Sequence, residues 1–314
     1  MLVILTKTPE VSLNGIKDRL KSFIKFFIGK KRGPAAVTES LLRGLRELNY
    51  IYKYNVNAAE IEKDDTIYIN ESVATLKWAI NAKKQGKIKR LITGPNITVA
   101  PDDQGGIMLD QNIDLILFPS QWTKNFWLLT NPELAEKIKI WPAGVVLPSK
   151  TDEEKKYFIV YQKNASDSLL KSIVENLIGQ NIQFKMINYG NYKQEDYFKL
   201  LNGSRGMIYL SESESQGLAL QEAWAHNVPT LVWNRGYVEQ KQRRFEGKKI
   251  SAPYLTEQAG MFFVGQADFN DTLEQFISKL VNFVPREYIM NNLTDKICAE
   301  NFLKLINYEN NPQN

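Results

Sequence analysis

The stretch "MIYLSESESQGLALQEAWAHNVPTLVW", from Met207 to Trp233, contains an apolar run, a polar loop, a helix-forming run and a second apolar run. The first apolar run ends near Leu210, and the second begins at Pro229. Both are short and rich in residues that favour strands, so each predicts a buried strand. Gly217 separates the loop from the helix-forming residues. The order strand, helix, strand predicts a parallel βαβ unit.

The same alternation recurs along the chain. Short apolar runs are separated by amphipathic stretches such as "SVATLKWAINAKKQGK" and "SDSLLKSIVENLIG". The predicted strands begin near Leu2, Asp65, Arg90, Asp114, Lys137, Tyr157, Gln183, Gly206, Pro229 and Gly260. Strands that alternate with helices predict an α/β fold, with parallel sheets covered on both faces.

The chain length and a linker-like stretch predict two domains. A chain of 314 residues with 43% hydrophobic residues can form two medium cores. The stretch "WPAGVVLPSKTDEEKK", from Trp141 to Lys156, contains prolines and then charges, and it falls between two series of strands. We predict an N-terminal Rossmann-like domain over residues 1–146 and a C-terminal one over residues 147–290. Residues 291–314 are predicted to form a terminal helix.

The rarity of cysteine and histidine excludes several kinds of site. The only cysteine, Cys298, excludes a disulfide framework and a cysteine-based zinc site. The only histidine, His226, excludes a His-rich metal site. It lies near the end of a predicted helix, where a histidine is expected to contact the last carbonyl groups. Adjacent aspartates in "PDDQGG" are expected to form a solvated turn, so no metal is predicted.

The charge pattern and the start of the chain bear on location. The formal charge of +5 leaves anionic ligands open. The run "MLVILTKTPE" has the pattern of a strand rather than a signal peptide, and no apolar run approaches the ~20 residues of a membrane-spanning helix. A cytoplasmic protein is therefore predicted. The basic amphipathic residues 15–33 are interpreted either as peripheral contact with an anionic membrane at its inner face or as an ordinary half-buried helix.

Ligands of open parallel sheets bind at the carboxyl ends of the strands, which ranks the loops of this chain. In the first half, Asn96 and Ser120 follow predicted strands and are candidates for the acceptor side. In the second half, Lys163 follows one predicted strand, and Tyr189 and Gly190 follow the next.

The loop from Ser211 to Gly217 is the strongest candidate. The first N–H groups of the helix after Gly217 have no internal partner, and a glycine allows a diphosphate to come close to the backbone. Glu222, in the second turn, can accept hydrogen bonds from ribose hydroxyls, and Glu214 can accept them from a sugar. An anion site between two carboxylates suits a phosphate between two polyols.

The pattern Glu214-x7-Glu222, with Gly-Leu inside it and "EAWAHNVPTLVW" after it, resembles the signature of retaining GT-B glycosyltransferases of the "glycosyl transferases group 1" type. Ser215 and Gln216 replace the usual Gly-Phe, and Asn227 replaces a later glycine. The resemblance implies two Rossmann-like domains that face each other across a cleft, with a C-terminal helix that returns to the N-terminal domain.

The resemblance also implies roles for individual residues. Glu214 and Lys163 are the residues implied to be catalytic: Glu214 contacts the donor sugar, and Lys163 takes the place of the family's arginine at the diphosphate. Glu222 binds ribose. The remaining donor-binding residues are Ser215, Gln216, Gly217, Leu218, Tyr189 and Gly190. For a second cation the alternatives are Lys171 and Arg205. The catalytic-site histidine that many relatives carry in the N-terminal domain is absent.

We therefore predict a glycosyltransferase that moves a sugar from a nucleotide-sugar to a sugar, lipid-linked or protein hydroxyl. The resemblance implies that the reaction retains the stereochemistry of the donor. No cofactor, metal or nucleic acid is expected. The alternatives are a nucleotide-sugar epimerase on the same fold and a non-catalytic nucleotide-sugar-binding partner subunit.

Overall fold

The computed structural model describes residues 1–9, 33–151 and 153–307. Two compact units make up the chain. Unit 1 comprises Met1–Ala143 and Cys298–Asn314, and unit 2 comprises Gly144–Ile297. The division after Ala143 falls inside the stretch that the sequence marks as a linker, a few residues before position 146. The basic residues 15–33 lie, except for Gly33, outside the described residues.

Unit 1 is built on a parallel sheet whose described strands follow the order β2-β1-β3-β4-β5-β6. Their bounds are β1 Leu2–Leu5, β2 Tyr52–Tyr54, β3 Thr66–Ile69, β4 Arg90–Thr93, β5 Leu115–Phe118 and β6 Ile138–Ile140. β1 and β5 are buried along their whole length, as expected of strands covered on both faces. The predicted strands of the first half are confirmed, and β2 is a strand that the sequence analysis missed.

Helices alternate with these strands. The α-helices are α2 Gly33–Glu47, α3 Val73–Lys84 and α4 Gln121–Leu128, and the short 3-10 turns are Ala58–Glu60, Asp103–Gly105, Ile107–Leu109 and Pro132–Leu134. Local chemistry explains where α3 begins, because the Ser72 hydroxyl accepts a hydrogen bond from the Thr75 backbone N–H. Such a cap satisfies one of the first N–H groups of a helix.

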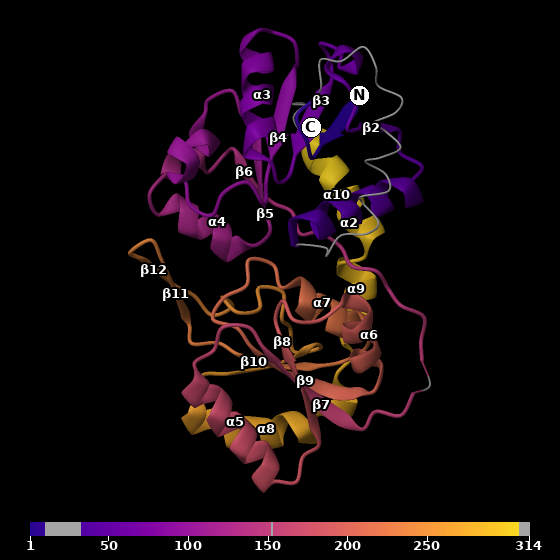
Figure 1. The fold of residues 1–314 in the computed structure, drawn as a ribbon, viewed down its shortest axis with the longest axis vertical. Coiled ribbons are helices and arrows are strands. Elements are labelled where there is room, and N and C mark those ends of the chain that lie inside the picture. The colour runs from indigo at the N-terminus through magenta and orange to yellow at the C-terminus, as the bar shows by residue number, and fades with distance from the viewer. Residues whose placement is uncertain (10–32, 152, 308–314) are drawn as a thin grey trace. The chain divides into compact units, whose positions relative to one another are not determined.

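Unit 2 is a second parallel sheet, whose described strands follow the order β13-β10-β9-β7-β8. The strands are β7 Tyr157–Gln162, β8 Phe184–Asn188, β9 Ser204–Leu210, β10 Thr230–Trp233 and β13 Gly260–Phe263. The helices are α5 Asp167–Gly179, α6 Gln194–Asn202, α7 Leu218–Ala225, α8 Gln266–Ser278 and α9 Pro285–Asn292, with a 3-10 turn at Leu280–Asn282. α5 and α8 cover one face of this sheet, and α6 and α7 cover the other (Figure 1).

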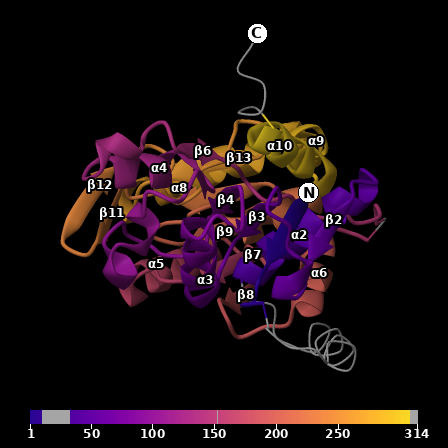
Figure 2. The ribbon, with the colours of Figure 1, turned by 90° about the horizontal axis from the view of Figure 1, so that it is seen from above.

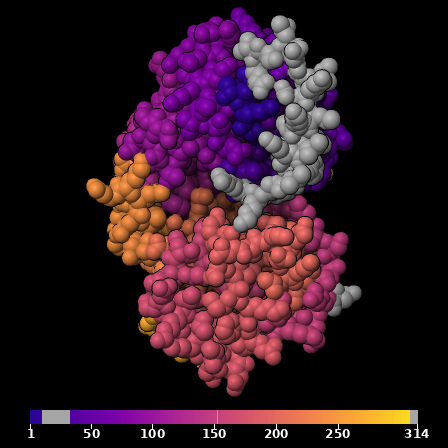
Figure 3. Space-filling view, viewed as in Figure 1, coloured from indigo at the N-terminus to yellow at the C-terminus, as the bar shows by residue number. Residues whose placement is uncertain are grey.

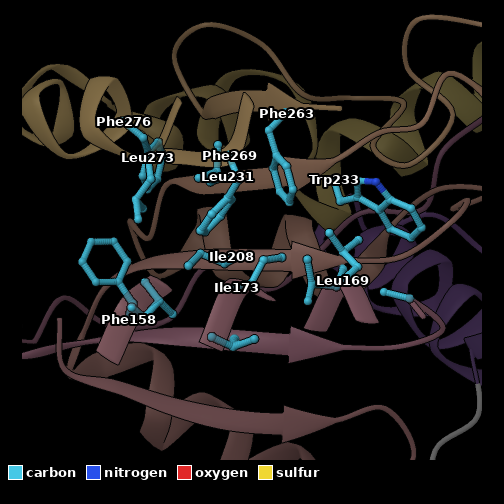
Figure 4. Close-up of a cluster of buried hydrophobic side chains, with 14 of the residues drawn as sticks. Phe158, Leu169, Ile173, Ile208, Leu231, Trp233, Phe263, Phe269, Leu273 and Phe276 are labelled. Carbon is cyan, nitrogen blue, oxygen red and sulfur yellow. The ribbon is translucent and has the colours of Figure 1, made fainter. Parts of the chain in front are cut away.

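The core of unit 2 lies between its sheet and the α5–α8 pair. Phe158, Ile208 and Leu231 project from three neighbouring strands toward Ile173 of α5 and Phe276 of α8 (Figure 4). Each of these side chains is at most 1% exposed. Burying a large apolar side chain contributes about 1.5–3 kcal/mol, so this cluster is a main source of stability for the sheet.

The final helix belongs to both units. α10 runs from Asp295 to Asn307, and the division between the units falls between Ile297 and Cys298. Phe302 of α10 packs edge-on against Tyr68 and Trp141 of unit 1, with ring centroids 4.9 and 5.2 Å apart. The expected return of a C-terminal helix to the N-terminal domain is thus observed. α10 lies within residues 291–314, and the separate helix α9 precedes it and ends at Asn292.

An antiparallel hairpin of unit 2 was not predicted. β11 (Tyr237–Gln240) pairs with β12 (Arg243–Glu246) and extends away from the five-stranded sheet (Figures 1 and 2). Figure 3 shows it in orange as a projection at the side of unit 2. Its turn residues, Lys241 and Gln242, have φ angles of 49° and 61°. Asn and Gly are the usual residues there, so the turn lacked the sequence signal of a hairpin.

Within the described ranges, no helix combines the length and the apolar character that crossing a membrane requires.

Candidate functional site

The loops after three neighbouring strands of unit 2 carry the predicted site residues. β7 lies between β9 and β8, and all three strands run in the same direction. Their carboxyl ends therefore share one edge of the sheet, where ligands of such folds bind. Lys163 follows β7, Tyr189 follows β8 and Glu214 follows β9. The Lys163 ammonium lies 4.7 Å from the centroid of the Tyr189 ring, a cation–π contact.

Lys163 and Glu214, the two residues predicted to be catalytic, form an ion pair. The Lys163 Nζ donates to Oε1 and Oε2 of Glu214 at 2.9 and 3.0 Å. Glu214 is only 8% exposed, and a buried carboxylate requires charge pairing and hydrogen bonds. The Lys163 side chain keeps 25% of its surface exposed, so it remains reachable from solvent. The structure thus joins a partly exposed cation to a buried anion.

Tyr209 provides a further hydrogen bond to the same carboxylate. It is on β9, it is 1% exposed, and its hydroxyl donates to Glu214 Oε1 at 2.6 Å. Burial, and then the negative charge of Glu214, raise the pKa of Tyr209 well above its usual value. The hydroxyl is therefore a neutral donor at neutral pH.

Tyr209 is itself held by a stack of tyrosines. Its ring is stacked on that of Tyr161 of β7, with centroids 4.8 Å apart and planes 20° apart. The Tyr161 hydroxyl lies 2.7 Å from the hydroxyl of Tyr192, in the loop after β8. Rings locked in this way have little freedom to turn, so the Tyr209 hydroxyl has a fixed position.

Gly217 is the N-cap residue of α7, which begins at Leu218. Its φ and ψ angles are 84° and 52°, the left-handed region that favours glycine. The backbone N–H groups that follow have no partner from a preceding turn, and the helix dipole makes this end partly positive. The left-handed glycine and the helix start are the two backbone features on which the diphosphate prediction rests.

The other residues of this loop have different surroundings. Ser215 is exposed, and Leu218 is half-buried. Gln216 is only 5% exposed, and its side-chain amide donates to Gln221 Oε1 at 2.9 Å. The Gln216 side chain therefore points into unit 2 and shapes the loop from within.

Glu222 lies on α7 with a neutral partner. Its Oε1 accepts a hydrogen bond of 2.6 Å from the side-chain amide of Gln194, the first residue of α6. Tyr189 and Gly190, in the loop between β8 and α6, are both exposed, and Tyr189 is 56% exposed. These residues bring the second predicted glutamate and the β8 loop to the same side of unit 2.

The candidates of unit 1 also follow strands. Asn96 lies after β4, and its side-chain amide donates to Asn70 Oδ1 at 2.9 Å. Asn70 in turn follows β3 and is 1% exposed. Ser120 is the N-cap residue of α4 and is 1% exposed, and its hydroxyl lies 3.2 Å from that of Thr123. Asn96 is thus the more accessible of the two candidates.

Neither alternative for a second cation joins Lys163. Lys171 is on α5, where its side chain is 77% exposed and pairs with Glu175. Arg205 is the second residue of β9, so it lies at the amino end of that strand, whereas Glu214 follows the carboxyl end. His226 caps α7, and its Nδ1 lies 2.8 Å from the carbonyl oxygen of Glu222. This is the helix-end contact that was expected of the only histidine.

The sequence analysis missed Tyr209, Gln194 and a second ion pair. Arg235 donates from both terminal nitrogens to Glu212, at 3.2 Å each. Tyr209 stands five residues before Glu214 in a strand, but nothing in an apolar run marks which side chain turns toward a later loop. The available signal for Tyr209 is a tyrosine hydroxyl in an apolar run close to a predicted catalytic glutamate, but this signal does not show which way the hydroxyl points.

A cavity of about 340 Å³ lies beside this second ion pair. Its lining includes Arg235, Glu212, Trp233 and Ser166. The polar groups there are already engaged, because Arg235 is paired and the Ser166 hydroxyl caps α5 by accepting from the Leu169 N–H.

In the part of the chain that the structure describes, no group of three or more His, Cys, Asp or Glu side chains could hold a metal ion.

The comparisons with known proteins identify the fold. No protein-family model matches the chain. No curated protein sequence matches it either. Among solved structures, the apo form of the lipopolysaccharide outer core galactosyltransferase WaaB is similar, with 12% sequence identity and a TM-score of 0.58. The similarity covers 98% of this chain and 100% of that one.

Two further structures extend the comparison. TarM is 14% identical, with a TM-score of 0.54, over 86% of this chain and 58% of that chain. The N-terminal domain of the Candida albicans trehalose-6-phosphate phosphatase is 10% identical, with a TM-score of 0.53, over 98% and 96% of the two chains. At such identities the likeness concerns the fold. The chain is an α/β protein with two Rossmann-like domains, and its fold matches that of GT-B glycosyltransferases.

Proposed function

We propose that the protein transfers a sugar from a nucleotide-sugar to a hydroxyl acceptor, with retention, and that unit 2 binds the donor. One observation carries the proposal. The partly exposed cation Lys163 and the buried carboxylate Glu214 form a pair at the carboxyl edge of a parallel sheet, in a loop that ends at the start of α7. A diphosphate needs the cation and the helix start, and a sugar that becomes cationic needs the carboxylate.

The proposed reaction breaks the bond between the anomeric carbon and the diphosphate oxygen, which leaves with the electron pair. Lys163 and the backbone N–H groups after Gly217 stabilise the departing diphosphate more strongly than the intact donor. Glu214 orients the sugar and stabilises its positive charge. The acceptor oxygen then bonds to the anomeric carbon on the same face, and its proton passes to the leaving phosphate.

Glu222 is proposed to bind the ribose. Its carboxylate lies on α7 beside the β8 loop, where the Gln194 amide fixes one of its oxygens. Carboxylates accept hydrogen bonds from hydroxyl pairs, as a ribose requires. This contact would exist in the bound donor, in the transition state and in the bound nucleotide product.

The fold comparison also supports sugar transfer. WaaB is a galactosyltransferase by name, and the similarity covers its whole chain. Neither alternative, the epimerase or the non-catalytic binding subunit, gains a specific observation from the contacts described above.

The test begins with a panel of uridine, guanosine and adenosine diphosphate sugars, screened by thermal shift. A ligand at a hundred times its dissociation constant adds about 2.7 kcal/mol of stability. With the best donor, Glu214→Gln, Glu222→Gln and the control Glu175→Gln are compared by calorimetry and by donor turnover. Glu175 is on the exposed face of α5, where it pairs with Lys171.

The two glutamate variants are expected to fail differently. Glu222→Gln should weaken the nucleotide-sugar and the nucleoside diphosphate alike, mainly through KM. Glu214→Gln should leave diphosphate affinity intact and lower kcat by about 10²–10³, by analogy with a lost oxyanion donor. The proposal fails if both variants behave like Glu175→Gln. Binding without turnover in the wild type would favour a partner subunit, and release of an altered sugar without acceptor would favour an epimerase.

Donor binding is also proposed to need no divalent cation, because Lys163 and the helix start supply the positive charge. Nucleoside diphosphate affinity should be the same with and without EDTA. A large loss of affinity on chelation would contradict this part of the proposal.

A further inference from the structure

We infer that Tyr209 is a positioning residue, whose buried hydroxyl holds the Glu214 carboxylate in place while Lys163 engages the diphosphate. The inference rests on the proposed function of Glu214 and Lys163. It adds a residue that carries no charge, touches no predicted ligand and belongs to a strand rather than a loop.

Glu214 needs an anchor because its own backbone is irregular. It follows β9 in a loop without regular secondary structure, before α7 begins at Leu218. The orientation of its side chain therefore depends on the groups that bind the carboxylate. Two such groups are Lys163, at 2.9 and 3.0 Å, and Tyr209, at 2.6 Å.

The two anchors differ in how firmly they are held. The Lys163 side chain is long and 25% exposed, and its ammonium is the group proposed to meet the incoming phosphates. When it shares its hydrogen bonds with a diphosphate, its hold on Glu214 weakens. Tyr209 is 1% exposed, and its ring is stacked on Tyr161, so it stays in place when the donor binds.

A neutral donor also suits the chemistry. The Tyr209 hydroxyl fixes Glu214 Oε1 without cancelling the negative charge of the carboxylate. Burial and the charge of Glu214 raise the pKa of Tyr209, so the hydroxyl keeps its proton. Glu214 then keeps both its orientation and its charge as the sugar becomes cationic. Misplacing a reacting group by about 1 Å can cost about 10²-fold in rate.

The test uses Tyr209→Phe, which removes one oxygen and leaves the stacked ring. The matched control is Tyr197→Phe on α6. Tyr197 is also fully buried, and its hydroxyl donates to the Ala219 carbonyl at 2.7 Å rather than to Glu214. Both variants should lose similar thermal stability, because each removes one hydrogen bond that a buried tyrosine hydroxyl donates.

Turnover separates the two variants. With the donor found in the panel, Tyr209→Phe should lower kcat about ten- to hundredfold, with nucleoside diphosphate affinity unchanged. Tyr197→Phe should retain the wild-type kcat. In the Glu214→Gln background, adding Tyr209→Phe should lower kcat no further, because a residue that acts through Glu214 has nothing left to position.

Each outcome is decisive. An unchanged kcat for Tyr209→Phe overturns the inference, and so does a full additional loss in the Glu214→Gln background. If the wild type turns over donor and Glu214→Gln does not, the proposed function stands whatever Tyr209 does. If the wild type turns over no donor, the proposed function fails, and the inference fails with it.

Discussion

Lys163 donates two hydrogen bonds to the carboxylate of Glu214, a residue 51 positions later in the chain. The contact means that the Lys163 ammonium, the group proposed to bind phosphate, already has a hydrogen-bond partner before any nucleotide-sugar binds. Its ammonium must exchange part of this pairing for a diphosphate, which carries more negative charge than one carboxylate. Nucleotide affinity should therefore depend on Lys163 only for ligands that carry phosphates.

The first prediction concerns Lys163→Ala. This variant should bind the nucleoside normally and lose about 1.5–3 kcal/mol of affinity for the nucleoside diphosphate, the range of a charge-assisted hydrogen bond. Calorimetry with the two ligands measures the difference. Lys171→Ala is the control, because that lysine is exposed on α5. Equal weakening of both ligands would mean that Lys163 does not contact phosphate.

The second prediction concerns Gly217→Ala. At a φ angle of 84°, an alanine costs about 1–2 kcal/mol. Its Cβ would also lie 3.1 Å from Leu220 Cδ1 and 3.6 Å from Glu214 Cβ. Gly236→Ala is the matched control, because Gly236 has a φ angle of 83° and no heavy atom within 4 Å of such a Cβ. Chemical denaturation should show a lower free energy of unfolding in both variants.

Only Gly217→Ala should also lower the affinity for the nucleoside diphosphate, because this variant disturbs the loop that carries Glu214 and the start of α7. If both variants bind the nucleotide like the wild type, the backbone at Gly217 is not part of the phosphate site.

The third prediction concerns His226, the only histidine of the chain. Burial lowers its pKa, the hydrogen bond with Glu222 O opposes this, and the charges of Lys155 and Arg286 lower it further. Above the usual value of 6.5 the group is neutral in the folded and unfolded chains, so it has no effect on stability. As the pH falls below that value, the unfolded chain binds the proton first, and stability is lost until the folded pKa is reached.

NMR titration gives this pKa from a single imidazole. The unfolding free energy should fall between pH 7 and pH 5 in the wild type and fall less in His226→Gln. A folded pKa above 6.5, or an identical pH dependence in the two proteins, would contradict the prediction.

The fourth prediction uses the only cysteine as a probe of α10. Cys298 is 1% exposed, and its carbonyl accepts a hydrogen bond of 2.9 Å from the Trp141 indole. Trp141→Phe leaves that carbonyl without this donor, at a cost of about 1–3 kcal/mol. The thiol should then react faster with a disulfide reagent under native conditions, by roughly tenfold for each 1.4 kcal/mol.

Trp233→Phe provides the comparison, because its indole donates to the Val264 carbonyl within unit 2. In Trp233→Phe, the Cys298 thiol should react at the wild-type rate. Equal acceleration in both variants would show that the reagent detects global unfolding rather than release of α10.

Apart from β2, the sequence predicted the strands of both sheets, because most of them contain a short apolar run that can be recognised without knowledge of its neighbours. The short strand β2 (Tyr52–Tyr54) is only half-buried and lacks such a run. The β11–β12 hairpin escaped because Lys241 and Gln242 adopt positive φ angles that their residue types do not signal. The candidate site was likewise predictable only in part. The positions of Lys163 and Glu214 follow from strand ends, and that of Glu222 follows from the helix after the second of these loops. Which side chains bind the two glutamates depends on contacts between different strands and helices.

Tyr209 and Gln194 illustrate that limit. In the sequence, Tyr209 is an aromatic residue of an apolar run, and Gln194 is a polar residue near a helix start. Each becomes relevant only because folding directs it to a glutamate that lies elsewhere in the chain, 5 and 28 residues away.

The division of the chain between the two units determines the order in which they can be completed during synthesis. Residues 144–297 are contiguous, so unit 2 has all its parts as soon as that segment has left the ribosome. Unit 1 is made first but must wait for Phe302, which covers Tyr68 and Trp141. Domains usually fold in the order of their synthesis. Here the first sheet to emerge is the last to be covered, so Tyr68 and Trp141 lack their Phe302 contact until the end of translation.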